Sequence, residues 1–279
     1  MNTSNQTYKD LSILYFKEVF DIIDEVMRLQ KIPYYLIGAN ALALELLKKG
    51  IAPCRGTKDI DFAIMLSSLS DYDDLIDLLE ERGFKRAKAP WTVYSEKFNV
   101  AIDILPFGEI EEHDTQDFTD RKSDLHLVGF KEVLASSTQV HIEDKIVQIP
   151  PLPGMVILKL VAWSDRPEER DSDLYDILII IEHYFDFNYD EIVEYHNDTF
   201  PEGDNEFDQL KISARVLGRK TKQFLQKSDP LKEKITQLMD RNLITPESSV
   251  IARHWTYDRE WDIEYAYQIL QEFKIGISE

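Results

Sequence analysis

The chain has 279 residues, of which 43% are hydrophobic, and a formal net charge of −20. An acidic surface of this kind repels nucleic acid over most of its area, which argues against bulk DNA binding. No apolar run reaches the roughly 18 residues of a membrane span, and the N-terminal residues lack the layout of a signal peptide. The single cysteine, Cys54, has no internal disulfide partner. We therefore expect a cytoplasmic protein with no membrane association.

The first half of the sequence alternates between helical and strand patterns. Apolar residues at steps of three and four predict helices, and short alternating runs predict strands. The predicted helices of this half cover residues 8–30, 39–49 and 70–83. The predicted strands cover residues 34–37, 58–65, 92–97, 99–105, 138–142 and 145–149. In this pattern Gly38 forms a tight turn, Ser70 caps a helix, and Pro106 and Gly108 end a strand.

The second half is mainly helical. Residues 109–124 are too polar to pack and are expected to form an acidic surface loop, and Pro150, Pro151 and Pro153 mark a domain boundary. The helical periods beyond it cover residues 153–164, 171–185, 209–227, 230–241 and 261–273. The sequence thus predicts an α+β protein, with helices and strands alternating in residues 1–150 and a mainly helical domain in residues 151–279.

Three aspartates stand out against apolar strands. Asp59 and Asp61 lie two residues apart in KDIDFAIM, so both side chains point to one face of the strand, and Asp103 is a lone acid in VAIDILPF. If the two strands are neighbours, the three carboxylates converge. Such a cluster is tolerable when a divalent cation neutralises it, and carboxylate oxygens suit magnesium. The alternative is that the first two acids line the solvent side of a half-buried strand.

Gly38 is a candidate phosphate-binding residue. A glycine between a strand and a helix lets phosphate oxygens approach the backbone N–H groups, and the helix N-terminus adds a positive dipole. In phosphoryl transfer two metal ions can hold the attacking and leaving oxygens, so carboxylates and phosphate donors are expected together.

The segments GANALAL (38–44) and RGTKDID (55–61) resemble motifs of the polymerase-beta-type nucleotidyltransferase superfamily. Within it they are similar to the AbiEii-like nucleotidyltransferases of type IV toxin–antitoxin systems, although Ala39 stands where that family has a second glycine or serine. Two later segments, PGMVILKLVAW (153–163) and RDSDLYDIL (170–178), are similar to its lysine-bearing helix and to the helix after it.

The resemblance implies a transfer of a nucleoside monophosphate from a nucleoside triphosphate (NTP), with two Mg²⁺ ions held by Asp59, Asp61 and Asp103. It also implies a nucleotidyltransferase domain in residues 1–150, built on a mixed sheet flanked by helices, and a helical domain in residues 151–279 that completes the active site. The nucleotide-binding residues implied are Gly38, Ala39, Arg55, Thr57 and Lys159. Asp173 or Asp176 would act as the general base or orient the acceptor, with Asp171 ranked below them. A salt bridge to Arg166 or Arg170 is the structural alternative for the other aspartate.

The acceptor stays open between several classes. In AbiEii-like systems it can be tRNA, and a cognate antitoxin protein is then expected. Residues 209–241, which we call the basic segment, carry nine Lys and Arg against three acidic residues and could contact RNA, although an ordinary solvated helix face is the plainer interpretation. A small cationic molecule fits the acidic balance of the chain, as in antibiotic-modifying nucleotidyltransferases. A non-catalytic nucleotide- or protein-binding member is a further alternative.

Overall fold

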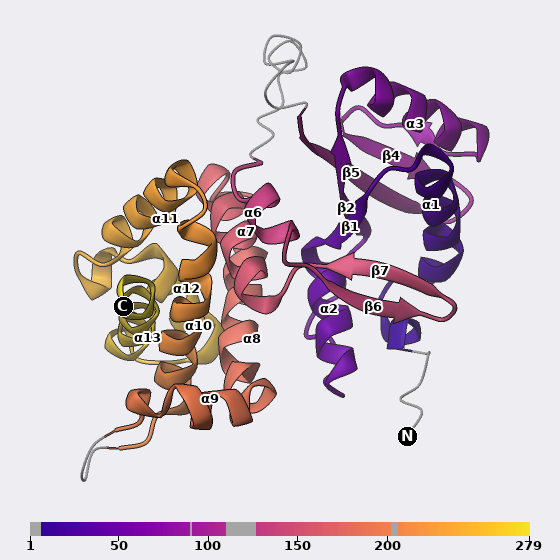
Figure 1. Ribbon diagram of the computed structural model, residues 1–279. Helices are drawn as coiled ribbons and strands as arrows, with labels where there is room; N and C mark the ends of the chain where they lie inside the picture. The colour runs from indigo at the N-terminus through magenta and orange to yellow at the C-terminus, as the bar shows by residue number, and fades with distance from the viewer. Residues whose placement is uncertain (1–6, 90, 110–126, 202–205) are drawn as a thin grey trace. The chain divides into compact units, whose positions relative to one another are not determined.

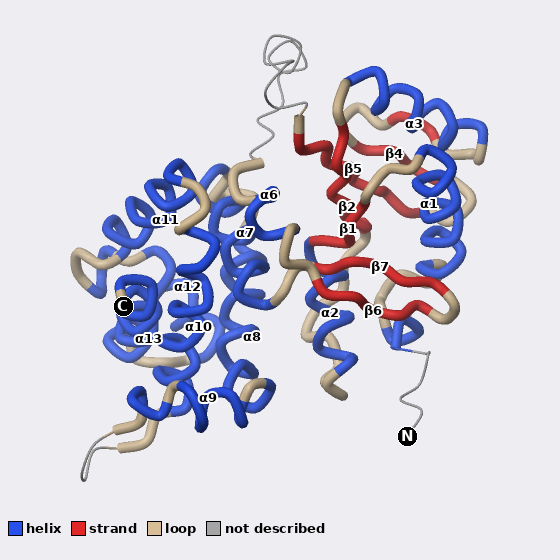
Figure 2. The backbone as a smooth tube through the Cα atoms, viewed as in Figure 1, coloured by secondary structure: helices blue, strands red, loops and turns tan. Residues whose placement is uncertain are grey.

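A computed structural model describes residues 7–89, 91–109, 127–201 and 206–279 (Figure 1). The chain divides into two compact units, Met1–Pro151 and Leu152–Glu279. Strands are found in the first unit and long helices make up the second (Figure 2). The expected α+β fold class is confirmed. The predicted acidic loop, residues 109–124, lies almost wholly outside the described residues.

The described part of the first unit contains a seven-stranded mixed sheet with the strand order β3-β4-β5-β2-β1-β7-β6. Its strands are β1 (Tyr34–Ile37), β2 (Asp59–Leu66), β3 (Lys85–Arg86), β4 (Thr92–Ser95), β5 (Val100–Gly108), β6 (Thr138–Ile142) and β7 (Lys145–Ile149). The central strand β2 is parallel to β5 and antiparallel to β1, and β1 is parallel to β7. The predicted hairpin of β6 and β7 is therefore an edge of the same sheet.

Alternation in β2 explains its central position. Ile60, Phe62 and Ile64 are fully buried, whereas Asp59 and Asp61 are half-buried on the opposite face. One apolar face therefore joins the core, and the acidic residues are left at an accessible position.

Pro106 does not end β5, as the sequence led us to expect. The strand continues to Gly108, and Pro106 lies opposite Ile64 of β2. Ile104 directs its backbone N–H away from β2, to the carbonyl of Trp91, and Pro106 lies two residues further on the same side. The pairing of β5 with β4 ends at Asp103, so no neighbouring strand needs the N–H that proline lacks.

The first unit also contains helices α1 (Phe16–Gln30), α2 (Gly38–Lys48), α3 (Leu69–Glu81) and α6 (Phe130–Leu134), and a short 3-10 helix, η1 (Thr7–Asp10). Helix α1 begins later than the sequence predicts, because the chain turns after η1. Ser12 hydrogen-bonds the backbone of Thr57, and Leu14 and Tyr15 are 91% and 45% exposed. Ser68, rather than Ser70, caps α3 by accepting the Asp71 N–H.

The second unit consists of helices that pack around apolar side chains. They are α7 (Leu152–Asp165), α8 (Asp171–Phe187), α9 (Tyr189–Tyr195), α10 (Gln209–Leu225), α11 (Asp229–Asn242), α12 (Val250–Arg259) and α13 (Ile263–Ser278). The sequence did not predict α6, α9 or α12, and α13 begins after Trp261 because Asp262 is its N-cap. None of the described helices is both long enough and apolar enough to cross a membrane.

Helices α10 and α13 cross at two glycines. A Cβ atom on Gly218 would lie 2.2 Å from the Phe273 carbonyl oxygen, and one on Gly276 would lie 2.0 Å from the Arg215 carbonyl oxygen. The two backbones therefore approach each other more closely than any side chain at the crossing would allow.

Candidate metal centre

Asp59, Asp61 and Asp103 converge on one face of the central sheet. Asp61 and Asp103 are register partners on the parallel strands β2 and β5, and Asp59 is two residues before Asp61. One carboxylate oxygen from each residue lies within 4.8 Å of the other two, and all three residues are half-buried. The expectation that these side chains meet is confirmed.

The donor set suits a hard divalent cation. Three carboxylates at this spacing repel one another, and a divalent cation would offset most of that repulsion. Carboxylate oxygens are the ligands that Mg²⁺ prefers, and it retains water at its remaining positions. The three residues could therefore bind a metal ion.

Gly38 lies directly against this acidic trio. It begins helix α2 with a left-handed φ of 65°, and a Cβ atom there would lie 2.1 Å from Oδ2 of Asp61. Glycine is required both by the backbone conformation and by the close approach of the carboxylate. The N-terminus of α2, with Ala39 in its first turn, therefore lies beside the trio, where free N–H groups can receive an anion.

The loop before β2 is attached to the trio through Thr57. Its hydroxyl donates to Oδ1 of Asp59, and its backbone N–H donates to the Ser12 hydroxyl at 3.0 Å. The Ser12 hydroxyl in turn donates to the Thr57 carbonyl oxygen at 3.1 Å. Arg55 lies in the same loop and is half-buried. The nucleotide-binding roles of Arg55 and Thr57 stay predictions.

Two residues that touch the trio were not predicted. Thr92 of β4 donates from its hydroxyl to Oδ1 of Asp103 at 2.5 Å. Asn40 of α2 is 1% exposed and donates from its side-chain amide to the carbonyl oxygen of Asp59 at 2.8 Å. A polar residue inside the apolar run GANALAL was the signal for Asn40. Nothing in the sequence near Thr92 marks it, because its role follows from strand register.

Lys159, Asp173 and Asp176 form a second cluster, within the helical unit. The Lys159 ammonium on α7 lies 2.6 Å from Oδ2 of Asp176 and 3.1 Å from Oδ1 of Asp173, both on α8. All three side chains are at least nine-tenths buried, and Arg170 adds a contact of 3.0 Å to Asp173. The inward direction predicted for the two aspartates agrees with their burial. Phosphate binding by Lys159 and a general-base role for either aspartate stay predictions.

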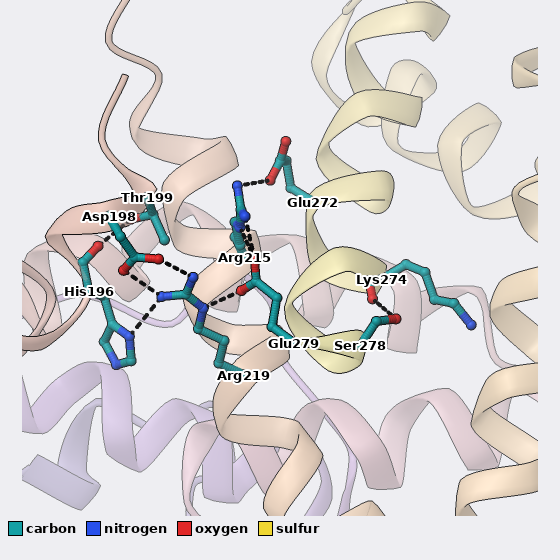
Figure 3. A network of polar contacts seen from close by, with 9 residues as sticks. All are labelled: His196, Asp198, Thr199, Arg215, Arg219, Glu272, Lys274, Ser278 and Glu279. Atoms are coloured by element: carbon teal, nitrogen blue, oxygen red, sulfur yellow. Dashed lines mark hydrogen bonds and ion pairs between the residues drawn. The ribbon is translucent and has the colours of Figure 1, made fainter. Parts of the chain in front are cut away.

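The basic segment is less available to anions than its composition suggests. In Figure 3 the guanidinium of Arg219 lies between Asp198 and Glu279, with its Nη1 2.8 Å from Asp198. Arg215 donates from Nε to Glu279 at 2.9 Å and lies 3.7 Å from Glu272. Arg215 and Arg219 of the basic segment are therefore paired with carboxylates within the unit itself.

Comparisons with known proteins find similarity in structure but not in sequence. No protein-family model matches the sequence, and no curated protein matches it significantly. Structure comparison does give matches, and one of them is a protein described as nucleotidyltransferase-like.

That match is the crystal structure of an antigenic nucleotidyltransferase-like protein from Paracoccidioides brasiliensis. It has 17% identity and a TM-score of 0.41, and the alignment covers 81% of this chain and 94% of that chain. A second match is the solution structure of the antibiotic-resistance factor ANT(2'')-Ia, with 12% identity, a TM-score of 0.35, and 65% of this chain and 96% of that chain covered. Similarity of this degree does not identify the reaction.

Proposed function

We propose that the protein is a magnesium-dependent nucleotidyltransferase that moves a nucleoside monophosphate group from an NTP to an acceptor. The observation that supports this best is the acidic trio on β2 and β5, with the backbone of Gly38 against Asp61 at the start of α2. A site of this kind offers ligands for a divalent cation and N–H groups for phosphate oxygens side by side. Magnesium bound here would offset the charge of the triphosphate and of the leaving group.

The residues of the first unit have distinct tasks in this proposal. Asp59, Asp61 and Asp103 hold the cation, and the first turn of α2 receives phosphate oxygens through its free N–H groups. An acceptor hydroxyl gives its proton to a general base and attacks the α-phosphorus, the bond from that phosphorus to the bridging oxygen breaks, and pyrophosphate leaves. Arg55 would neutralise phosphate charge at the entry to β2. The assignments of Lys159, Asp173 and Asp176 to the same reaction rest on the sequence motifs.

The central test is transfer of label from NTP. Purified protein is incubated with Mg²⁺ and each α-labelled NTP in turn, with total RNA or with aminoglycosides as hydroxyl-bearing acceptors. We expect a labelled product and release of pyrophosphate. The variant Asp103→Asn should lose at least about a hundredfold in rate, because losing a ligand should exceed the 10–100-fold loss typical of a ligand's hydrogen-bond partners.

The matched control is Asp144→Asn, which removes the same charge from an exposed turn of the same unit. It should keep the wild-type rate. The proposed reaction is wrong if the wild-type protein transfers no label to any acceptor and releases no pyrophosphate.

Among acceptors we favour a small cationic molecule over RNA. The net charge of −20 attracts cations, and Arg215 and Arg219 already have carboxylate partners. A tRNA acceptor, with a toxin role and an antitoxin partner, is the alternative that the AbiEii-like motifs predict. Label in the RNA fraction alone would decide for tRNA, and label in the aminoglycoside fraction would decide for the cationic acceptor.

A further inference from the structure

Two members of the acidic trio, Asp59 and Asp103, each accept a hydrogen bond from a threonine hydroxyl. Thr57 donates to Oδ1 of Asp59 from the loop before β2, and Thr92 donates to Oδ1 of Asp103 from the neighbouring strand β4. The two threonines reach the trio from different elements. Neither contact is needed for the sheet itself, since Thr57 lies outside the strands and a valine at position 92 would keep the backbone pairing.

We propose that Thr57 and Thr92 are positioning residues that hold Asp59 and Asp103 in the converged arrangement before a metal ion binds. This inference rests on the proposed function. Without such contacts, carboxylates within 4.8 Å of one another would rotate apart to reduce their repulsion. A hydroxyl that donates to one oxygen fixes the rotation of the carboxylate and offsets part of its charge.

The contacts around Thr92 hold it in a position suited to this role. Thr92 is the register partner of Asp103 across the antiparallel pair of β4 and β5, so their side chains share one face of the sheet. Its neighbour Trp91 is 4% exposed and packs edge-on against Tyr72 of α3, with ring centroids 5.0 Å apart. The Trp91 carbonyl oxygen also accepts the Ile104 N–H at 2.8 Å. The strand that carries the hydroxyl is therefore fixed on both sides.

Thr57 is fixed differently, by the segment between η1 and α1. The Ser12 hydroxyl accepts the Thr57 N–H and donates to the Thr57 carbonyl oxygen, which holds this residue at two points. A Cβ atom on the preceding Gly56 would lie 3.1 Å from Cβ of Ser12, so the two segments are in close contact. Ser12 thus acts on Asp59 through Thr57, over a large distance in sequence.

Metal binding measured without nucleotide tests the proposal independently of catalysis. Mn²⁺ serves as the probe, and free and bound ion are distinguished by electron paramagnetic resonance on the full-length protein. Thr92→Val keeps the branched shape but removes the hydroxyl, and we expect its Mn²⁺ affinity to fall about 10- to 100-fold. Thr92→Ser keeps the hydroxyl and should restore affinity to within about threefold of wild type.

The control is Thr138→Val, the same change at an exposed position on β6 at the far edge of the sheet, which should leave the affinity unchanged. Thermal unfolding of each variant shows that it is folded, and Thr57→Val, with the same expected loss, replaces Thr92→Val if that variant is not. Equal affinities of wild type and the valine variants would overturn the proposal, as would an equal loss in Thr92→Ser. A wild-type protein that binds no Mn²⁺ would instead overturn the proposed function.

Discussion

At Gly38 the absence of a side chain leaves room for the Asp61 carboxylate beside the start of α2. Its φ of 65° makes any other residue strained, and a Cβ atom would overlap Oδ2 of Asp61 at 2.1 Å. Gly50 has a similar left-handed φ of 80° but no atom within 4 Å of its missing Cβ. A side chain at Gly50 would therefore add backbone strain alone, whereas a side chain at Gly38 would add both backbone strain and an overlap with the trio.

We expect Gly38→Ala to lower the transfer rate by at least tenfold, because Asp61 must move away from the added methyl group. Gly50→Ala should leave the rate unchanged and destabilise the protein by about 1 kcal/mol, the usual cost of a left-handed alanine. Initial rates and urea unfolding of both variants measure this. Equal rates for Gly38→Ala and wild type would show that Asp61 is not constrained by this contact.

Lys159 is a residue whose removal should affect stability strongly. It is the shared partner of Asp173 and Asp176, and all three are buried. We expect Lys159→Met to cost about 3–5 kcal/mol of unfolding free energy, since it leaves two buried carboxylates without their ammonium partner. Asp176→Asn should cost less, because Lys159 then keeps one carboxylate. Urea unfolding that ranks the two variants in the opposite order would contradict this view of the cluster.

At the scale of elements, a buried carboxylate joins helix α1 to strands β1 and β7. Asp24 on α1 is 2% exposed and accepts a hydrogen bond from the Tyr34 hydroxyl at 2.6 Å, and its Oδ2 lies 3.1 Å from the Lys145 ammonium. Arg28 donates to it at 2.9 Å. Burial alone would raise the pKa of Asp24, but these donors outweigh burial and hold its pKa below the usual value.

This contact should make stability depend on acid. A carboxyl with a lowered folded-state pKa contributes stability above its unfolded pKa, near 3.9, and loses it as pH falls through the folded value. We expect Asp24→Asn to cost about 2 kcal/mol near pH 7 and to show a smaller loss of stability than wild type between pH 5 and pH 3. Urea unfolding across that range, with Asp144→Asn as the exposed control, tests this. Parallel curves for wild type and Asp24→Asn would contradict it.

The elements were predictable where one residue pattern determined them. The alternation in residues 58–65 fixed β2 to within one residue, and the lone acids in two apolar strands indicated the trio. Where tertiary contacts decide, the sequence was misleading. The contact of Ser12 with Thr57 delays the start of α1, and Pro106 continues β5 because no neighbouring strand needs its N–H.

The same distinction holds for the residues around the site. Asp59 and Asp61 lie on one face because a strand has a period of two, which is a local property. The contact of Thr92 with Asp103 requires the register of β4 on β5, which no local pattern specifies. For this reason the carboxylates could be found from the sequence and the threonine on β4 could not.

At the scale of the whole molecule, the net charge is strongly negative. The chain has 52 acidic and 32 basic residues. Several basic residues of the helical unit form ion pairs within that unit, among them Arg215, Arg219 and Lys234. The basic segment therefore offers less unpaired positive charge than its composition suggests, which agrees with the proposed cationic acceptor.

The parallel pairing of β2 with β5 also has a consequence for how the protein folds. Asp61 and Asp103 become neighbours only when this pair forms. In the sequence the two strands are separated by α3, β3 and β4. Contacts between residues so distant in the chain form late, because the intervening loop must close first. A partly folded chain that lacks this strand pair has all three aspartates but not their converged arrangement, so the proposed cation binding would mark completion of the central sheet.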